Sequence, residues 1–252
     1  MKRLINPAIE AVVNRIFNVD QYADVFEKLA MWPRLSPLAQ RCLHHKIAPD
    51  VRSQPALFIH IPKNGGTSIK QSLYVSDPGH ATIRFYELVA PEMLERAASF
   101  AIIRDPVDRF LSGYDFLMNG GGSDVTIQSA AYRRLAHIRS IDDFLTYLES
   151  IRGNWFLVDT FARPQWWYVT DNAGNLRVKT LWLLGDQNAA IDAHLLRLGV
   201  PGLKHANKTQ RISHCLSAVQ LRRLEHIYEP DFELHARLTS RNCNSLPLDA
   251  AP

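Results

Sequence analysis

The segment 61–68, with the sequence IPKNGGTS, has the residue types of an anion-binding loop. Glycines allow a backbone to approach an anion, and the free N–H groups at the start of a helix favour negative charge. Lys63 adds a cation, and the hydroxyls of Thr67 and Ser68 can complete the cradle. The segment therefore predicts a phosphate-binding loop, the plainer alternative being a Gly-Gly turn beside an exposed lysine.

The order of residues in this loop differs from that of the nucleoside-triphosphate loop, G-x-x-x-x-G-K-[ST]. The lysine precedes the glycine pair, and no lysine stands directly before Thr67. There is also no clear acidic strand end to hold Mg²⁺, unless Asp186 has that role. Since lysine and the helix N-terminus supply positive potential, and the histidines lack metal-ligand spacing, we expect no metal requirement.

A second polar group follows the apolar run 99–103. Arg104 comes directly after this predicted strand, at the end where ligands bind in open parallel sheets. Asp105 is expected to cap the helix that Pro106 begins. Arg109 stands four residues after Asp105, so it either pairs with that carboxylate or serves the site.

Strands that alternate with helices must position these residues. Apolar runs predict strands at 56–61, 99–103 and 180–184. Helical patterns are expected at 67–74, 106–117, 127–138, 140–151, 188–198 and 214–239. This alternation predicts an α/β fold, P-loop-like and three-layered, in which helices flank a mainly parallel central sheet.

The chain is expected to divide into three parts. Short amphipathic helices over 8–45 predict an N-terminal helical extension, joined to the rest by the segment 47–55. The predicted boundaries are 1–50 for the extension, 51–245 for the α/β domain and 246–252 for a C-terminal tail. Loops that set specificity are expected at 74–90, 118–126 and 163–178.

The composition of the 252 residues, 46% hydrophobic and 21% charged, is typical of a globular protein and excludes disorder, collagen-like repeats and coiled coil. The net charge of +4 suits a small anionic ligand and is too weak to indicate nucleic acid. Three cysteines without zinc or redox spacing indicate reduced thiols. With no apolar run of signal-peptide or membrane-spanning type, we expect a cytoplasmic protein. Its oligomeric state is not predicted.

Two segments together resemble the PAPS-dependent sulfotransferase family, in particular its Golgi-type and bacterial carbohydrate branch (sulfotransferase family 2-like). FIHIPKNGGTSI at 58–69 resembles the 5′-phosphosulfate loop, and FAIIRDPVDRFLSGY at 100–114 resembles the 3′-phosphate motif. The two motifs stand in the family's order. Weaker similarity, including YEPDF at 228–232, extends the resemblance over roughly residues 56–240.

The resemblance implies transfer of a sulfuryl group from 3′-phosphoadenosine 5′-phosphosulfate (PAPS) to a hydroxyl of a carbohydrate or glycosylated acceptor, with 3′,5′-bisphosphoadenosine (PAP) as product. Such in-line transfer depends on positioning and charge stabilisation. Lys63 is then the cation at the bridging oxygen, while Arg104 and Ser112 bind the 3′-phosphate. The further donor-binding residues implied are Asn64, Gly65, Gly66, Thr67 and Ser68 in the loop, and Asn207, Lys208 and Thr209 late in the chain.

An acceptor hydroxyl needs a general base, for which His or Glu is suited near neutral pH. His80 lies where related carbohydrate sulfotransferases place their base, and Glu87 is the competing candidate. His60, inside the first predicted strand, is expected in the core. Gln165 and Trp166 could form an acceptor-binding wall, or belong to the core with the neighbouring aromatic residues.

Two other classes of function stay open beside the sulfotransferase hypothesis. One is a nucleotide-dependent kinase with a degenerate P-loop, which would require Mg²⁺ and turn over ATP. The other is a non-catalytic module that binds a nucleotide through both phosphate sites and has lost its base.

Overall fold

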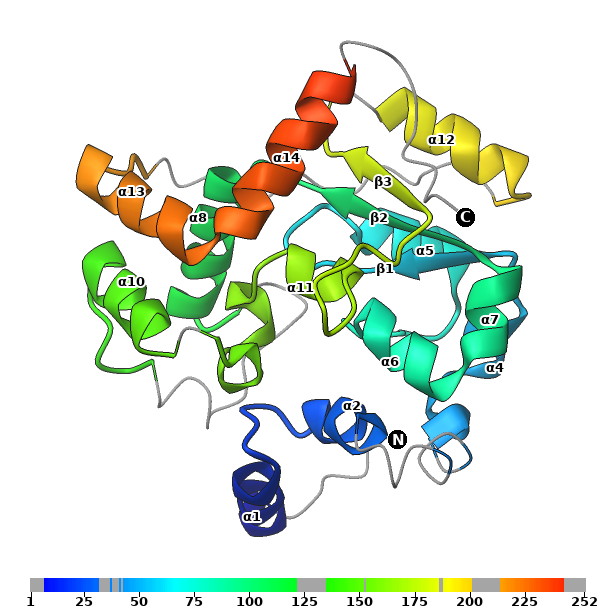
Figure 1. Ribbon diagram of the computed structural model, residues 1–252, viewed down its shortest axis with the longest axis horizontal. Coiled ribbons are helices and arrows are strands. Elements are labelled where there is room, and N and C mark those ends of the chain that lie inside the picture. Colours follow the sequence, from blue (N-terminus) through cyan, green and yellow to red (C-terminus); the bar gives the residue numbers. More distant parts are fainter. Residues whose placement is uncertain are drawn as a thin grey trace.

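The structure, a computed structural model, describes residues 7–31, 37, 41, 43–121, 135–151, 153–185, 188–200 and 214–242. Within these residues a parallel three-stranded sheet in the order β1-β2-β3 lies at the centre (Figure 1). The strands are β1 (Ala56–Ile59), β2 (Ala98–Ile103) and β3 (Thr180–Leu183). All three predicted strands are confirmed, with β1 ending before the Ile61-Pro62 step into the loop.

Helices occupy most of the remaining described chain. Before the sheet and around β1 they are α1 (Pro7–Phe17), α2 (Asp24–Ala30), η1 (His44–Lys46), α4 (Pro49–Ser53), α5 (Thr67–Leu73), α6 (Ile83–Val89) and α7 (Pro91–Arg96). After β2 they are α8 (Pro106–Met118), α10 (Ile141–Ser150), η2 (Trp155–Leu157), η3 (Thr160–Ala162) and α11 (Trp166–Val169). After β3 they are α12 (Asn188–Arg197), α13 (Ala218–Ile227) and α14 (Glu229–Asn242).

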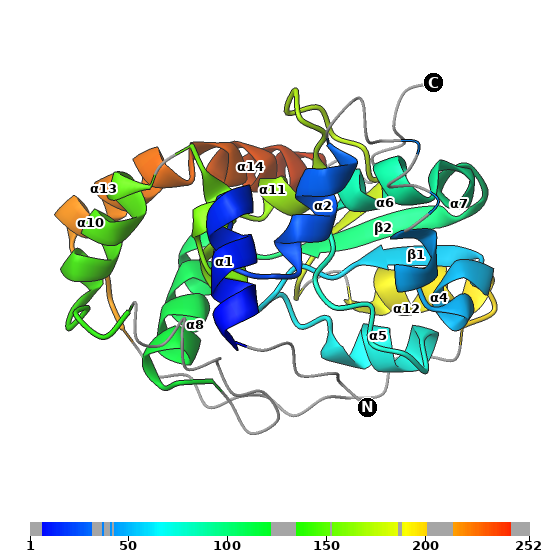
Figure 2. The same cartoon turned by 90° about the horizontal axis from the view of Figure 1, so that it is seen from below.

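The sheet is covered on both faces, which confirms the predicted α/β fold. Figure 2 shows α5 and α12 on one side of the strands and α6, α11 and α14 on the other. The residues of β1 are all buried, as are five of the six in β2, because each strand lies between two helical layers. Parallel pairing places Phe58 opposite Phe100 and brings the carboxyl ends of both strands to one edge.

A second apolar core adjoins that edge of the sheet. It contains Phe110, Tyr114 and Leu117 of α8 together with residues of α10, η2 and α13. Because α8 follows β2 directly, this core fixes the direction in which the chain leaves the sheet (Figure 1). Asp105 caps α8 by accepting a hydrogen bond from the Asp108 backbone N–H at 2.9 Å, as predicted.

Gly113 allows α8 to approach η3 closely. A Cβ at this position would lie 2.5 Å from the Phe161 carbonyl oxygen. We expect Gly113→Ala to lower the free energy of unfolding by about 1–3 kcal/mol, because the overlapping atom belongs to backbone and cannot rotate away. Urea unfolding of the two proteins measures this, and unchanged stability would contradict the close packing of α8 on η3.

The N-terminal helices are joined to the α/β domain through buried ion pairs. Glu27 of α2 accepts hydrogen bonds from Arg84 Nε at 3.0 Å and from Thr82 Oγ1 at 2.8 Å. Asp24 accepts two hydrogen bonds from the Arg163 guanidinium, at 2.9 and 2.5 Å. Both acidic residues are buried, so α2 contributes to the interior of the α/β domain.

Two segments expected as connections are helical. The joint 47–55 contains α4, and the expected loop 74–90 contains α6. Thr82 caps α6 by accepting from the Phe85 backbone N–H at 3.2 Å. The tail predicted helical over 214–239 is divided between α13 and α14. The helix predicted over 127–138 lies largely outside the described residues.

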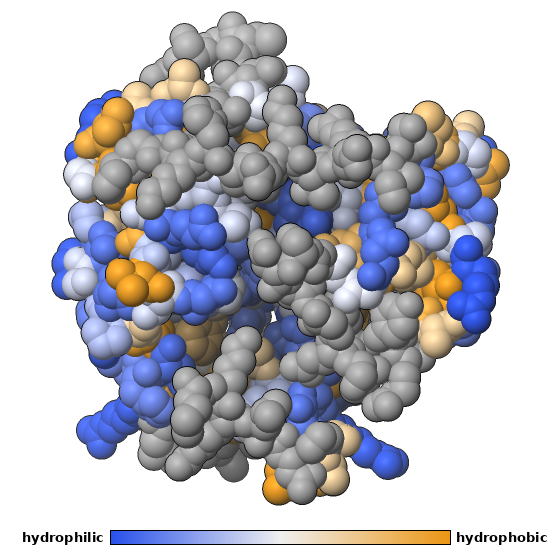
Figure 3. Space-filling model, turned by 180° about the vertical axis from the view of Figure 1, so that it is seen from behind, coloured by the Kyte–Doolittle hydropathy of each residue, from blue (hydrophilic) through white to orange (hydrophobic). Residues whose placement is uncertain are grey.

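On the face seen from behind, hydrophilic residues predominate among those described, and hydrophobic ones occur in small groups (Figure 3). Among the described helices, none has both the length and the apolar composition needed to cross a membrane.

Candidate functional site

The predicted phosphate-binding loop lies between β1 and α5, at the carboxyl edge of the sheet. Lys63 and Gly65 both have positive φ, 68° and 71°, so the chain turns sharply before α5 begins. A Cβ on Gly66 would lie 2.5 Å from His60 Cδ2 and 2.8 Å from Phe58 Cζ. Glycine is therefore required at position 66 because the loop backbone rests directly on the His60 ring.

Arg104 joins the end of β2 to this loop. Its Nη1 donates to the Lys63 carbonyl oxygen at 3.0 Å, and its Nη2 lies 3.4 Å from the Asp108 carboxylate. The two motifs recognised in the sequence are thus in direct contact, as parallel pairing of β1 with β2 requires.

Lys63 is half-buried in a region of positive potential. Burial lowers the pKa of its ammonium group, and Arg104 and Arg109 lower it further. Arg109 is 1% exposed, and its Nε makes a weak 3.4 Å hydrogen bond to the Pro62 carbonyl oxygen. Three cations therefore converge on the loop. Asp108 beside Arg104 and Asp115 near Lys63 offset their mutual repulsion in part, and a bound anion would offset it further.

Two phenylalanines link Lys63 to His80. The Lys63 ammonium lies over the Phe116 ring, 4.4 Å from its centroid. The centroid of Phe116 is 4.2 Å from that of Phe161, which in turn is 5.6 Å from that of His80. The predicted catalytic lysine and base therefore lie on opposite sides of one aromatic pair, neither member of which carries a signal in the sequence.

A hydrogen bond fixes the tautomer of the His80 imidazole. His80 Nδ1 lies 2.9 Å from the His60 carbonyl oxygen. A carbonyl only accepts, so Nδ1 carries the proton and the neutral ring has its lone pair on Nε2. Burial lowers the pKa of His80 to about 4, partly offset by this hydrogen bond. His80 is therefore neutral near pH 7, with Nε2 able to accept a proton.

The scan against family models matches residues 51–236 to the model described as the Sulfotransferase family. The chain belongs to the sulfotransferase family. A search of curated proteins and a search of solved structures each returned no match. Family membership makes this protein an enzyme of sulfuryl-group transfer, and the matched range contains every part of the site described above.

In this sulfotransferase we expect His80 to titrate far below the usual range of histidine. NMR titration of the imidazole resonances from pH 3.5 to 8, with His80→Gln to assign the signal, should give a midpoint near 4. As the pH falls, the histidine is protonated near pH 6.5 in the unfolded chain but only near pH 4 in the folded protein. The free energy of unfolding should therefore decrease as the pH falls from about 6.5 toward 4. A midpoint at or above 6.5 would contradict a half-buried His80 that stays neutral near pH 7.

The side chains of Asn64 and Gln165 both lie in the interior. Asn64 is 1% exposed and Gln165 is 0% exposed, and Asn64 Nδ2 donates to Gln165 Oε1 at 2.7 Å. The burial of Gln165 agrees with the core alternative and not with an acceptor wall, and in Asn64 only the backbone is left to face a donor. These two amides support the loop from beneath, because their polar groups pair with each other.

Other candidates lie elsewhere or outside the described residues. Glu87 forms an ion pair with Arg177, and in the described part of the chain Asp105 and Arg109 are not paired with each other. Trp166 is partly exposed at the edge of the second core. Thr67 is exposed and Ser68 buried at the start of α5, and Ser112 is half-buried on α8. Asp186, Asn207, Lys208 and Thr209 lie outside the described residues.

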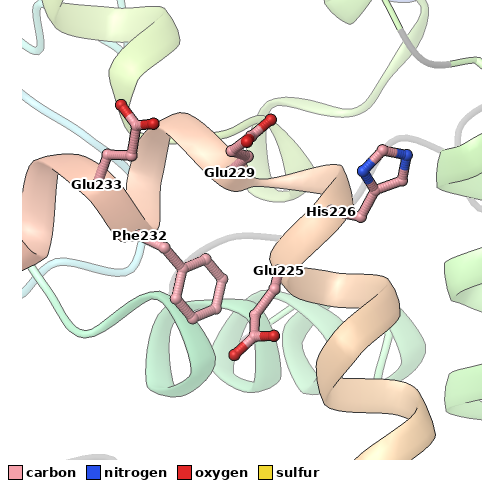
Figure 4. Close-up of a pocket in the computed structure, with 5 residues that line it drawn as sticks. All are labelled: Glu225, His226, Glu229, Phe232 and Glu233. Atoms are coloured by element: carbon pink, nitrogen blue, oxygen red, sulfur yellow. The ribbon is translucent and has the colours of Figure 1, made fainter.

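A cavity of about 370 Å³ on α13 and α14 differs in character from this site (Figure 4). It is lined by Phe232, His226 and three glutamates, Glu225, Glu229 and Glu233. Carboxylates would repel a donor that carries several negative charges, so the cavity does not suit PAPS. Within the described residues, no three or more His, Cys, Asp or Glu side chains, those of this cavity included, are arranged so that they could hold a metal ion.

Proposed function

We propose that this sulfotransferase uses PAPS as its donor and a hydroxyl of a carbohydrate or glycosylated molecule as its acceptor. The observation that carries the proposal is the convergence of Lys63, Arg104 and Arg109 at the carboxyl ends of β1 and β2. A donor with a phosphosulfate and a 3′-phosphate would add negative charge to this group, beyond that of Asp108 beside Arg104 and of Asp115 near Lys63. The glycine turn leaves backbone N–H groups near the same place.

The residues present fit the chemistry of such a donor. Lys63 would stabilise the negative charge that develops on the leaving phosphate oxygen. Arg104, held by its bond to the Lys63 carbonyl, would pair with the 3′-phosphate, and Ser112 on the following helix would add a hydroxyl. The carbohydrate acceptor rests on the resemblance of the two motifs to that branch of the family.

On the acceptor side, His80 Nε2 would take the hydroxyl proton as the new S–O bond forms and the bond from sulfur to the bridging oxygen breaks. The proton moves to His80 and the electron pair to the phosphate of the departing PAP. The aromatic pair Phe116 and Phe161 lies between His80 and Lys63, so it would border the place where the acceptor meets the donor.

We expect Arg104→Ala to weaken PAP binding by about ten- to a hundredfold, because a charged hydrogen bond contributes about 1.5–3 kcal/mol. Its kcat at saturating donor should change much less, since the 3′-phosphate contact is equal in the ground and transition states. Calorimetric titration with PAP measures the first effect. Arg177→Ala, which removes a surface ion pair with Glu87, is the matched control. Equal affinity of wild type and Arg104→Ala would contradict the assignment.

Transfer of labelled sulfate from PAPS tests the proposed reaction. Incubation with a panel of oligosaccharides, phenols and amines should label the oligosaccharides, with a rate that falls in His80→Ala. Labelling of phenols alone would overturn the carbohydrate acceptor. A His80→Ala variant as fast as wild type would remove His80 as the base while leaving the donor unaffected.

A further inference from the structure

Gln165 contacts both phosphate motifs from inside the protein. Its Oε1 accepts hydrogen bonds from Asn64 Nδ2 at 2.7 Å and from the Arg104 backbone N–H at 2.9 Å. Its Nε2 donates to the Arg104 carbonyl oxygen at 2.9 Å. One fully buried side chain therefore ties the loop after β1 to the residue after β2, from a segment about 60 residues farther along the chain.

The backbone of Arg104 dictates the orientation of this amide. A backbone N–H only donates and a carbonyl only accepts, so Gln165 must direct Oε1 to the first and Nε2 to the second. Oε1 also faces the Asn64 amide, and because an oxygen can only accept, Asn64 must turn its NH2 group toward Gln165. The remaining Asn64 N–H donates to the Ile102 carbonyl oxygen at 2.6 Å.

Asp231 of α14 holds the backbone that carries Gln165. Its two carboxylate oxygens accept from the Gln165 N–H at 2.7 Å and from the Trp166 N–H at 2.8 Å. Both N–H groups belong to the start of α11, so a single carboxylate fixes its position. Asp231 is 1% exposed and stands in the YEPDF segment at 228–232, to which the proposed function gives no role.

We infer that Asp231 is a positioning residue for the donor site, acting through Gln165 to hold the Lys63 loop and Arg104 at the spacing that a donor with two phosphate-bearing ends requires. This inference rests on the proposed function for its ligand. Hydrogen bonds between described residues make each connection. Asp231 of α14 accepts from the backbone of Gln165 at the start of α11, and the Gln165 side chain accepts from Asn64 after β1 and from Arg104 after β2.

The charge state of Asp231 suits this role. Burial raises the pKa of its carboxyl to about 6, while the two backbone N–H groups and the nearby Arg109 guanidinium act in the opposite direction. Near pH 7 the group is therefore a carboxylate with two accepting oxygens. Asparagine at this position offers only one acceptor, so one of the two N–H groups loses its partner.

Amide hydrogen exchange of Asp231→Asn tests the positioning role without any ligand. We expect protection of the Arg104 amide, which donates to Gln165 Oε1, to fall by about tenfold, because losing one buried hydrogen bond costs about 1–3 kcal/mol. Glu233→Gln, a change at an exposed residue on the same helix, is the matched control and should leave the Arg104 amide unchanged. Faster exchange confined to 164–166 and 229–233 would overturn the inference.

A double-mutant cycle with PAP supplies the second readout. Asp231→Asn and Asn64→Ala should each weaken PAP binding by about tenfold, and the double variant should bind no more weakly than the worse single variant. Additive losses would show that the two residues act independently, against the inference. If Asp231→Asn does not fold, Gln165→Met, which keeps the buried volume, takes its place in both experiments. Failure of wild type to bind PAP would refute the proposed donor, and the exchange experiment would still decide the positioning role.

Discussion

Lys63→Ala is expected to lower kcat by about a hundred- to a thousandfold, the usual cost of removing one donor to a developing negative charge. Lys63 would act on the bridging oxygen, where charge builds up as the bond to sulfur breaks. Its ammonium lies near Arg104 and Arg109, and burial together with these cations lowers its pKa. An anion bound at the loop would therefore stabilise the charged form of Lys63. PAP affinity should change far less than kcat, because the main interaction is made in the transition state.

Lys28→Ala is the matched control for this variant. The Lys28 ammonium on α2 also lies over an aromatic ring, 4.4 Å from the centroid of Phe156, and it belongs to no part of the site described above. We expect its removal to leave kcat within about threefold, since a contact of this kind contributes only about 0.5–1 kcal/mol. Steady-state kinetics with PAP titrations separates the two effects. Equal losses in kcat and PAP affinity for Lys63→Ala would contradict the assigned role.

Glu27→Ala is expected to lower the free energy of unfolding by about 3–5 kcal/mol. Glu27 is 5% exposed and pairs with the buried Arg84, whose guanidinium also lies 3.9 Å from the centroid of the Trp167 ring. Truncation to alanine leaves this cation in the interior without a counter-charge. Burial also raises the pKa of Glu27, which shows how strongly the interior opposes a single charge at this place.

Urea unfolding measures this loss, with Glu92→Ala as the control. Glu92 is an exposed carboxylate that pairs with His44 at 3.1 Å, so its removal should cost less than about 1 kcal/mol. A Glu27→Ala protein as stable as the Glu92→Ala protein would mean that α2 is peripheral to the fold. The expected difference would instead show that α2 belongs to the core.

The sequence predicted the sheet and the loop well because both depend on local residue types. Apolar runs of strand length located β1, β2 and β3, and the order of lysine and glycines located the turn before α5. Asp105 before a proline predicted the cap of α8. Parallel pairing then required Lys63 and Arg104 to meet at one edge of the sheet.

The direction in which side chains point could not be predicted in the same way. Asn64 stands within the anion-binding segment, yet its amide turns inward to meet Gln165, about 100 residues away. Residue types in the loop give no sign of that partner. The Phe116–Phe161 pair and the Glu27–Arg84 pair also join distant segments, so only the folded chain reveals them.

Calorimetric titration of the wild-type protein with PAP, beside a titration with ATP and Mg²⁺, tests the central claim most directly. The proposed function predicts micromolar binding of PAP without a metal, and much weaker binding of ATP with Mg²⁺. Preference for ATP with Mg²⁺, or binding of neither nucleotide, would contradict a donor site built from the Lys63 loop and Arg104.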